Sequence, residues 1–123
     1  MIRVILVDDA EQVRQALKER LNFEPDIEVT GEAESGEAAL DLVARLRPDV
    51  VVMDVKMPQG DGIYAARWLA ATFPECRIVM LSLYDDPVNR SRAKEAGSSA
   101  FICKQDDEMS LLAAIREAGP IQT

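Results

Sequence analysis

The sequence predicts an α/β fold in which a five-stranded parallel sheet lies between two layers of helices. Two observations lead to this expectation. Short apolar runs alternate along the chain with segments of helical periodicity, and the central run, 50–53, contains no polar residue before Asp54. Runs of this kind are typical of strands buried on both faces, and strict alternation with helices requires right-handed crossovers between parallel strands. We therefore expect one three-layer (βα)5 domain.

Each strand and helix has a signal of its own. The expected strands cover 3–7, 27–30, 50–55, 77–83 and 100–104. The expected helices cover 10–21, 35–46, 63–73, 87–94 and 106–118. Most of the strands are continuous aliphatic runs, and the helical segments repeat apolar residues every three to four positions. The fourth helix has few apolar anchors, so we expect it to be among the less stable elements.

Capping and turn residues predict where the helices begin and end. Asp8 or Asp9 is expected to cap the first helix, and Ser35 the second. Gly97 is expected to stop the fourth helix, because glycine adopts the left-handed conformation that ends many helices. The segment 58–62 is dense in turn residues and is expected to be a loop.

The third helix carries an aromatic pair. Tyr64 and Trp68 lie four positions apart, on one face of the helix and next to its inward stripe. They either cover part of the core or contact a partner, and the sequence favours the first interpretation.

Composition and charge restrict the class of protein. Of the 123 residues, 48% are apolar and 29% are charged, which is typical of a globular domain large enough to bury a core. The formal net charge of −8 argues against nucleic-acid binding by this domain, because such binding needs a basic face. The chain has no histidine, which excludes histidine bases and histidine metal ligands within it.

Secretion and membrane insertion have no signal in the chain. No apolar run is long enough to cross a bilayer, and the amino terminus lacks the cleavage pattern of a signal peptide. The two cysteines, Cys76 and Cys103, are too few for a disulfide framework and lack the spacing of a zinc site. A reduced, cytoplasmic protein is the simplest expectation.

Polar residues stand at the ends of four predicted strands. Asp8 and Asp9 follow the first strand, Asp54 and Ser82 end the third and fourth, and Lys104 ends the fifth. The carboxyl ends of parallel strands share one edge of a doubly wound sheet, and ligands bind at that edge. If the first and third strands are neighbours, three carboxylates meet there, with a hydroxyl and an ammonium beside them.

Such a group of side chains suits phosphoryl chemistry. Three close carboxylates repel one another unless a proton or a cation joins them, and oxygen ligands alone select a hard ion. Mg²⁺ binds through one or two carboxylates and leaves room for phosphate oxygens. Lys104 would supply a positive charge and Ser82 a hydrogen-bond donor to a phosphoryl group on Asp54, since aspartate is an established phosphoryl nucleophile. Each of these residues alone has a simpler explanation, such as capping a helix. Their occurrence together at the ends of the strands favours phosphoryl chemistry.

Several short motifs follow one another along the whole chain. They are Val7-Asp8-Asp9, Met53-Asp54-Val55-Lys56-Met57-Pro58, Asp61-Gly62, Leu81-Ser82, and Ala96-Gly97 followed by Phe101 and Lys104. In this order they resemble the receiver domain of two-component response regulators. The segments 28–33 and 47–51 are most similar to the NarL/FixJ (LuxR-type) subgroup. The resemblance implies a flavodoxin-like fold with strand order 2-1-3-4-5.

The resemblance also implies a phosphorylation-dependent signalling switch that needs Mg²⁺. Asp54 would be the phosphoacceptor. Asp9, Asp54 and the backbone carbonyl of Lys56 would bind the ion directly, and Asp8 would help through a water molecule. Such a protein catalyses only its own phosphorylation and dephosphorylation and is otherwise not an enzyme.

The remaining site residues would sense the modification. Lys104 would pair with the phosphoryl group, Ser82 would move to bond it, and Phe101 would turn inward behind it. The fourth helix, fifth strand and fifth helix would then present a changed surface to an output.

Three residues depart from the usual pattern of the family. Gln105 stands where many receivers have a proline, often after a cis bond; a cis bond before a non-proline residue costs about 2.5–4 kcal/mol, so we expect trans. Leu83 replaces a small residue and is expected to narrow access to Asp54. Phe101 lacks the hydroxyl of a tyrosine, so a switch there would work by packing alone.

Partners and further domains follow from the same resemblance. The phosphoryl donor would be a sensor histidine kinase, and phosphorylation would produce a homodimer. We expect a receiver domain over 1–119 and the start of a linker or tail over 120–123. DNA would be bound through a C-terminal helix-turn-helix domain that the chain lacks, and no membrane contact is expected.

Three other functions compete with this one. An aspartate-nucleophile, Mg²⁺-dependent phosphatase places its nucleophile after the first strand, whereas here the aspartate expected to be better buried, Asp54, follows the third. A flavodoxin-like mononucleotide binder needs a Ser/Thr/Gly-rich loop after the first strand, but 8–11 is acidic. A receiver-like interaction module that is never phosphorylated would not need the acceptor, the acids and the lysine together.

Overall fold

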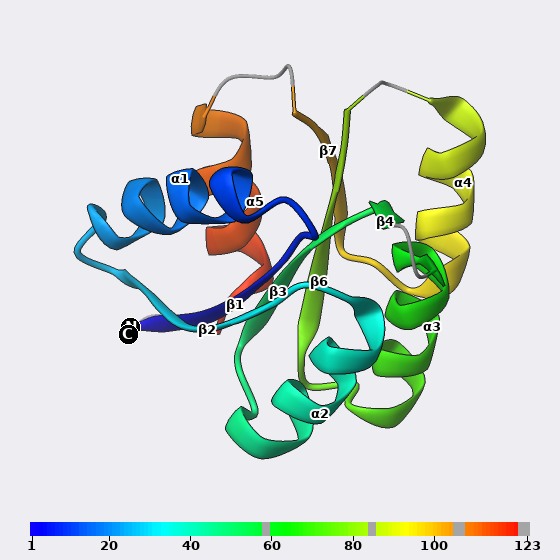
Figure 1. Cartoon of the computed structure of the whole chain (residues 1–123), viewed down its shortest axis with the longest axis horizontal. Helices are drawn as coiled ribbons and strands as arrows, with labels where there is room; N and C mark the ends of the chain where they lie inside the picture. Colours follow the sequence, from blue (N-terminus) through cyan, green and yellow to red (C-terminus); the bar gives the residue numbers. More distant parts are fainter. Residues whose placement is uncertain (58–59, 84–85, 105–107, 121–123) are drawn as a thin grey trace.

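In the part of the chain that the structure describes, five parallel strands form one sheet and five helices cover its faces (Figure 1). This computed structural model describes residues 1–57, 60–83, 86–104 and 108–120. The strands of the sheet are β1 (Ile2–Val7), β2 (Ile27–Ala33), β3 (Val50–Asp54), β6 (Arg77–Ser82) and β7 (Ala100–Cys103). The helices are α1 (Glu11–Asn22), α2 (Gly36–Leu46), α3 (Gly62–Thr72), α4 (Pro87–Ala96) and α5 (Glu108–Ala118). Among these helices, none has the length and apolar character needed to span a bilayer.

The order of the strands confirms the predicted topology. The sheet runs β2-β1-β3-β6-β7, and every neighbouring pair is parallel. Numbered by the strands of this sheet alone, the order is the predicted 2-1-3-4-5. The chain reverses its direction of winding between β1 and β3, and the carboxyl ends of these two strands therefore lie side by side at the switch point.

Two hydrophobic cores hold the layers together, one on each face of the sheet. Helices α1 and α5 cover one face, and α2, α3 and α4 cover the other (Figure 1). The central strand β3 contributes to both: Val51 and Met53 pack into one core, and Val50 and Val52 into the other. Complete burial of one such side chain stabilises the fold by about 1.5–3 kcal/mol. The continuous apolar run before Asp54 is thus explained by burial on both faces.

The segment predicted to be a loop after β3 contains a small antiparallel hairpin instead. Its strands, β4 (Lys56–Met57) and β5 (Gly60–Asp61), pair Lys56 with Asp61 and Met57 with Gly60. The loop prediction was therefore wrong for 60–61, which form β5, and for Gly62, which begins α3. Turn residues signal a reversal of the chain, but they do not show that the residues on either side pair through their backbones. The hairpin returns the chain to the end of β3, where α3 begins.

The observed helix ends test the capping predictions. The Ser35 hydroxyl accepts a hydrogen bond from the Ala38 N–H (3.1 Å), and Gly97 ends α4 with a φ of 101°, as predicted. The cap expected at Asp8 or Asp9 was wrong, because Ala10 is the N-cap of α1 and provides no side-chain bond.

The aromatic pair of α3 faces solvent. Tyr64 is 74% exposed, so the prediction that the pair covers part of the core was wrong for it. Trp68 is 48% exposed, which agrees with partial cover. The neighbouring residues Ile63 and Ala66 are buried in their place. A spacing of four residues puts two side chains on one face, but it does not say which neighbouring helix, if any, covers that face.

Candidate functional site

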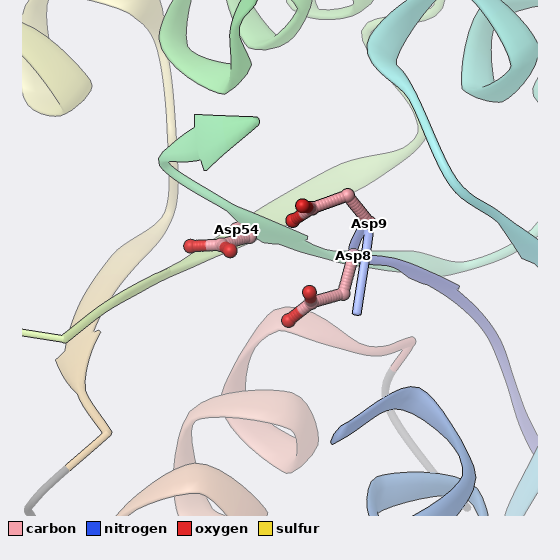
Figure 2. Close-up of side chains that lie close together, drawn as sticks. All are labelled: Asp8, Asp9 and Asp54. Atoms are coloured by element: carbon pink, nitrogen blue, oxygen red, sulfur yellow. The ribbon is translucent and has the colours of Figure 1, made fainter. Parts of the chain in front are cut away.

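Three carboxylates gather where β1 and β3 end (Figure 2). The two strands are hydrogen-bonded neighbours, with Val7 opposite Met53, so the residues that follow them come to the same place. One oxygen of each of Asp8, Asp9 and Asp54 lies within 4.8 Å of the others. The predicted meeting of the three acids at this edge of the sheet is therefore confirmed.

The three acids differ in exposure. Asp8 and Asp54 are only 2% and 8% exposed, whereas Asp9 is open to solvent. The expectation that Asp54 is the better buried of the aspartates was wrong, since Asp8 is buried more deeply. The Asp8 oxygens are already engaged: Oδ1 accepts from the Ala10 N–H (2.9 Å) and Oδ2 lies 3.2 Å from the Lys104 ammonium. Depth of burial therefore does not identify the reactive carboxylate here.

Lys104 joins the acids from the end of β7. Its Nζ lies 3.2 Å from Asp8 Oδ2 and 3.3 Å from Asp54 Oδ2. Its backbone N–H donates to the carbonyl of Ser82 (2.6 Å), which holds the end of β7 against the end of β6. One ammonium thus bridges two buried carboxylates that stand far from it in sequence.

Burial and charge shift the pKa values of two of these groups. Burial raises the pKa of Asp54 above its usual value, the nearby Asp8 charge adds to the rise, and Lys104 offsets only part of it. Burial alone would lower the pKa of Lys104, but the Asp54 and Asp8 charges outweigh it and raise that pKa. The lysine is therefore held in its charged form, while the negative charge of Asp54 is costly.

Asp54 opens into a pocket of about 250 Å³. The pocket is lined by Asp54, Val55, Lys56, Ser82, Leu83, Asp86, Asn89 and Lys104. The structure thus brings together the predicted acceptor, hydroxyl and ammonium. Leu83 lines this pocket as expected, yet its side chain is 53% exposed, so it stands at the mouth rather than within.

A glycine shapes the backbone behind the acceptor. A Cβ atom on Gly62 would lie 2.0 Å from the carbonyl oxygen of Asp54, and the Gly62 N–H donates to the carbonyl of Val55 (2.7 Å). No side chain larger than hydrogen fits there without moving the end of β3.

The donor set fits a hard divalent cation. The cluster has three carboxylates and one ammonium, so an added positive charge would balance it, and every available side-chain ligand is an oxygen. Asp9 is the exposed member of this cluster. The Lys56 N–H points to Asp54 Oδ1 (3.4 Å), and the predicted role of its carbonyl stays a prediction.

Phe101 is not among the described residues that line the Asp54 pocket. Phe101 is buried in β7, and the Arg90 guanidinium of α4 stacks over its ring, 4.8 Å from the centroid. Gln105 and the tail beyond Pro120 lie outside the described residues.

Asp86 and Asn89 were not among the residues expected at the site. In the sequence, Asp86 signals only the start of a helix, because aspartate before Pro87 is a good cap. Nothing in the local sequence shows that this end of α4 borders the Asp54 pocket.

Comparisons with known proteins identify a family for the chain. The family described as "Response regulator receiver domain" matches residues 4–116. The DNA-binding transcriptional activator DevR/DosR of Mycobacterium tuberculosis is 38% identical over 119 residues, which cover 97% of this chain and 55% of that protein. A protein-glutamate methylesterase/protein-glutamine glutaminase of Nocardioides is 43% identical over 105 residues, which cover 84% of this chain and 29% of that protein.

Solved structures give the same result. The signal receiver domain of the response regulator NarL from Mycobacterium tuberculosis superposes with a TM-score of 0.88 at 28% identity, and the match covers 94% of each chain. The similarity to NarL- and LuxR-type regulators predicted from the sequence is thus confirmed. The chain spans about half the length of the transcriptional activator and less than a third of the esterase.

Proposed function

The chain belongs to the response regulator receiver domain family, and from that premise we propose that it is a signalling switch phosphorylated on Asp54. One observation carries the proposal. Asp54 is the carboxylate of the cluster that lines the pocket, and its Oδ2 lies 3.3 Å from the Lys104 ammonium. A buried carboxylate with a raised pKa, an adjacent cation and an open approach is suited to act as a nucleophile.

The reaction is a transfer of a phosphoryl group between two side chains. An oxygen of Asp54 attacks the phosphorus of a phosphohistidine on a sensor histidine kinase, an O–P bond forms, the N–P bond breaks, and the imidazole leaves with its electron pair. The chain has no histidine, so the donor histidine lies outside these 123 residues. Lys104 balances the charge that arrives on Asp54, and the Ser82 hydroxyl donates to a phosphoryl oxygen from the end of β6.

Mg²⁺ completes the site. Asp9 and Asp54 would hold the ion directly with the Lys56 carbonyl, and Asp8 through water. When bound, the ion neutralises part of the charge shared by the carboxylates and the phosphoryl group. The direct role of Asp9 is the one that the family resemblance implies, and its carboxylate is the exposed member of the cluster.

The signal leaves through α4, β7 and α5. Ser82 lies at the end of β6, next to β7, where Phe101 is packed beneath Arg90. A shift of Ser82 toward the phosphoryl group opens space that the Phe101 ring can fill, which changes the surface around Arg90. Hydrogen exchange with and without beryllofluoride, a phosphoryl mimic, checks this step; identical protection in α4 and β7 would contradict it.

The output belongs to a longer protein. We propose that residues 1–119 are the receiver and that the chain continues from 120–123 into an output domain, as in relatives twice its length. DevR/DosR is described as a DNA-binding transcriptional activator, which favours a transcriptional output. We also propose that phosphorylation produces a homodimer and that the protein is cytoplasmic. A net charge of −8 makes the receiver itself an unsuitable DNA-binding surface.

The decisive experiment is incubation with Mg²⁺ and acetyl phosphate, or with a phosphorylated kinase, followed by intact mass. We expect a gain of one phosphoryl group that Asp54→Ala abolishes. Asp41→Ala, which removes an exposed acid on α2, is the matched control and keeps the gain. No gain from either donor would instead identify a receiver-shaped interaction module.

A further inference from the structure

Asn89 is a buried polar residue that the proposed reaction does not yet use. It lies in the first turn of α4, is only 8% exposed, and lines the pocket together with Asp54, Ser82 and Lys104. A buried amide needs hydrogen-bond partners to offset its loss of water. Its position at the acceptor pocket therefore calls for an explanation.

Two neighbours hold the Asn89 amide in one orientation. The Arg92 guanidinium donates to Asn89 Oδ1 (3.0 Å), and Asn89 Nδ2 donates to Asp86 Oδ2 (3.2 Å). Since Oδ1 faces a donor and Nδ2 faces an acceptor, the two ends of the amide cannot exchange places. An NH₂ group carries two hydrogens and gives one to Asp86, so the second is available to an acceptor in the pocket.

The same contacts tie Asn89 to the amino end of α4. Asp86 is the N-cap: its Oδ1 accepts from the backbone N–H groups of Val88 (2.9 Å) and Asn89 (3.4 Å). This end of α4 lies at the edge of the sheet where the strands end (Figure 1). The positive end of the helix dipole thus borders the pocket as well.

A phosphoryl group on Asp54 brings negative charge that Lys104 cannot satisfy alone. The lysine already contacts both Asp8 and Asp54. A phosphoryl group has three acceptor oxygens, and on the α4 side of the pocket Asn89 offers a neutral, oriented N–H donor. Asp86, on the same side, can only accept or repel while ionised.

We propose that Asn89 is a phosphoryl-binding residue: its side-chain amide donates to an oxygen of the group on Asp54 and links that group to the cap of α4. The inference rests on the proposed function, because it needs Asp54 to be modified. It adds a contact from α4 to those made by Lys104 and Ser82. It also gives α4 a direct connection to the modified site, separate from the packing of Phe101.

The test compares Asn89→Leu, which keeps the branched shape of the side chain and removes the donor, with Ser91→Ala, an exposed change on the same helix. With Mg²⁺ present, we expect Asn89→Leu to weaken beryllofluoride binding about tenfold, as for a lost hydrogen bond to a charged group, and to change the lifetime of the aspartyl phosphate. Ser91→Ala should alter neither. Asn89→Ala, with a thermal melt of each variant, replaces Asn89→Leu if that variant fails to fold.

The wild-type protein supplies a readout that a purely structural role would not move. We expect the Asn89 side-chain NH₂ resonances, assigned by their loss in the variant, to shift when beryllofluoride binds. Unshifted resonances and unchanged affinity, in a protein that is still phosphorylated on Asp54, would overturn the inference and leave the proposed function standing. A wild-type protein that neither binds beryllofluoride nor accepts a phosphoryl group would overturn both.

Discussion

The two edges of the sheet use the same kinds of charged residue for different purposes. At the amino edge, Arg116 donates to Asp26 (2.8 Å) and Glu24 (2.7 Å), Arg20 also pairs with Glu24 (3.0 Å), and Arg47 pairs with Glu75 (2.9 Å), all through side chains that are partly exposed. At the carboxyl edge, two of three carboxylates are buried and share one ammonium. The amino edge balances its charge, whereas the carboxyl edge keeps an excess of negative charge away from solvent.

This difference separates groups that stabilise the fold from groups that are ready to react. Hydrogen bonds from Arg116 lower the pKa values of Glu24 and Asp26, so their ionised forms favour the folded state. Burial raises the pKa of Asp54, so its ionised form disfavours the folded state. The carboxyl edge therefore lowers the stability of the folded state, and a cation or phosphoryl group that binds there can offset this loss.

The largest effect is expected where backbone geometry supports the carboxyl edge. Gly62→Ala would place a methyl group 2.0 Å from the Asp54 carbonyl oxygen, a contact that only a backbone shift can relieve. We expect a loss of about 3 kcal/mol or more in the free energy of unfolding, at the upper end for overpacked sites, together with slower phosphorylation. In Gly31→Ala the new atom meets only leucine side-chain ends at 3.0–3.1 Å, and stability should hardly change. Urea denaturation measures both, and a wild-type midpoint for Gly62→Ala would contradict the geometry.

The second largest expected effect is a stabilisation by Mg²⁺ that depends on the carboxyl edge and not on the amino edge. An ion that binds only the folded state stabilises it by about 2.7 kcal/mol at a concentration one hundred times its Kd. We expect a rise in Tm with Mg²⁺ that Asp9→Asn largely removes, because this exposed acid is a proposed ligand. Asp26→Asn, at the amino edge, should keep the full rise; equal responses of the two variants would place the ion elsewhere.

Removing the Lys104 ammonium should change the free energy of unfolding less than Gly62→Ala or Mg²⁺ binding does. Lys104→Ala leaves Asp8 and Asp54 without their common partner, and we expect a loss of about 1–3 kcal/mol at neutral pH without metal. Arg116→Ala removes an exposed cation and should have a clearly smaller effect. Denaturant titrations under one set of conditions check the order, and a larger loss for Arg116→Ala would reverse the comparison between the edges.

The smallest expected effect concerns pH, because the carboxylates at the two edges should change the stability of the protein in opposite directions as the pH falls. The folded-state pKa of Asp54 lies above its unperturbed value of 3.8, so its cost is present at neutral pH and disappears as the pH falls through that raised value. The pKa values of Glu24 and Asp26 lie below 4.5 and 3.8, so their contribution is present above those values and is lost as the pH falls. At neutral pH without metal, Asp54→Asn should therefore be more stable than wild type and Arg116→Ala less stable. Both differences should shrink in acid, and differences of the same sign would refute this account.

Local signals were sufficient for the fold and for most of the candidate site. The run ending in Asp54 predicted a doubly buried strand, and the ends of the other strands predicted that Lys104 and Ser82 would lie near it. The same logic failed for the β4–β5 hairpin and for Tyr64, since backbone pairing and helix neighbours are not encoded in spacing. Which aspartate is better buried also depended on contacts far along the chain.

The sequence by itself determined which residues form strands, which residue ends each one, and that charge would collect at one edge of the sheet. Those properties depend on the period of apolar residues and on nearby breakers, which are local. Only the tertiary structure decided that Lys104 bridges Asp8 and Asp54, that Gly62 must lack a side chain, and that Asn89 borders the acceptor pocket. These features depend on how α3, α4 and β7 pack around the end of β3. Such packing brings together residues that are far apart along the chain, and the local sequence does not predict their contacts.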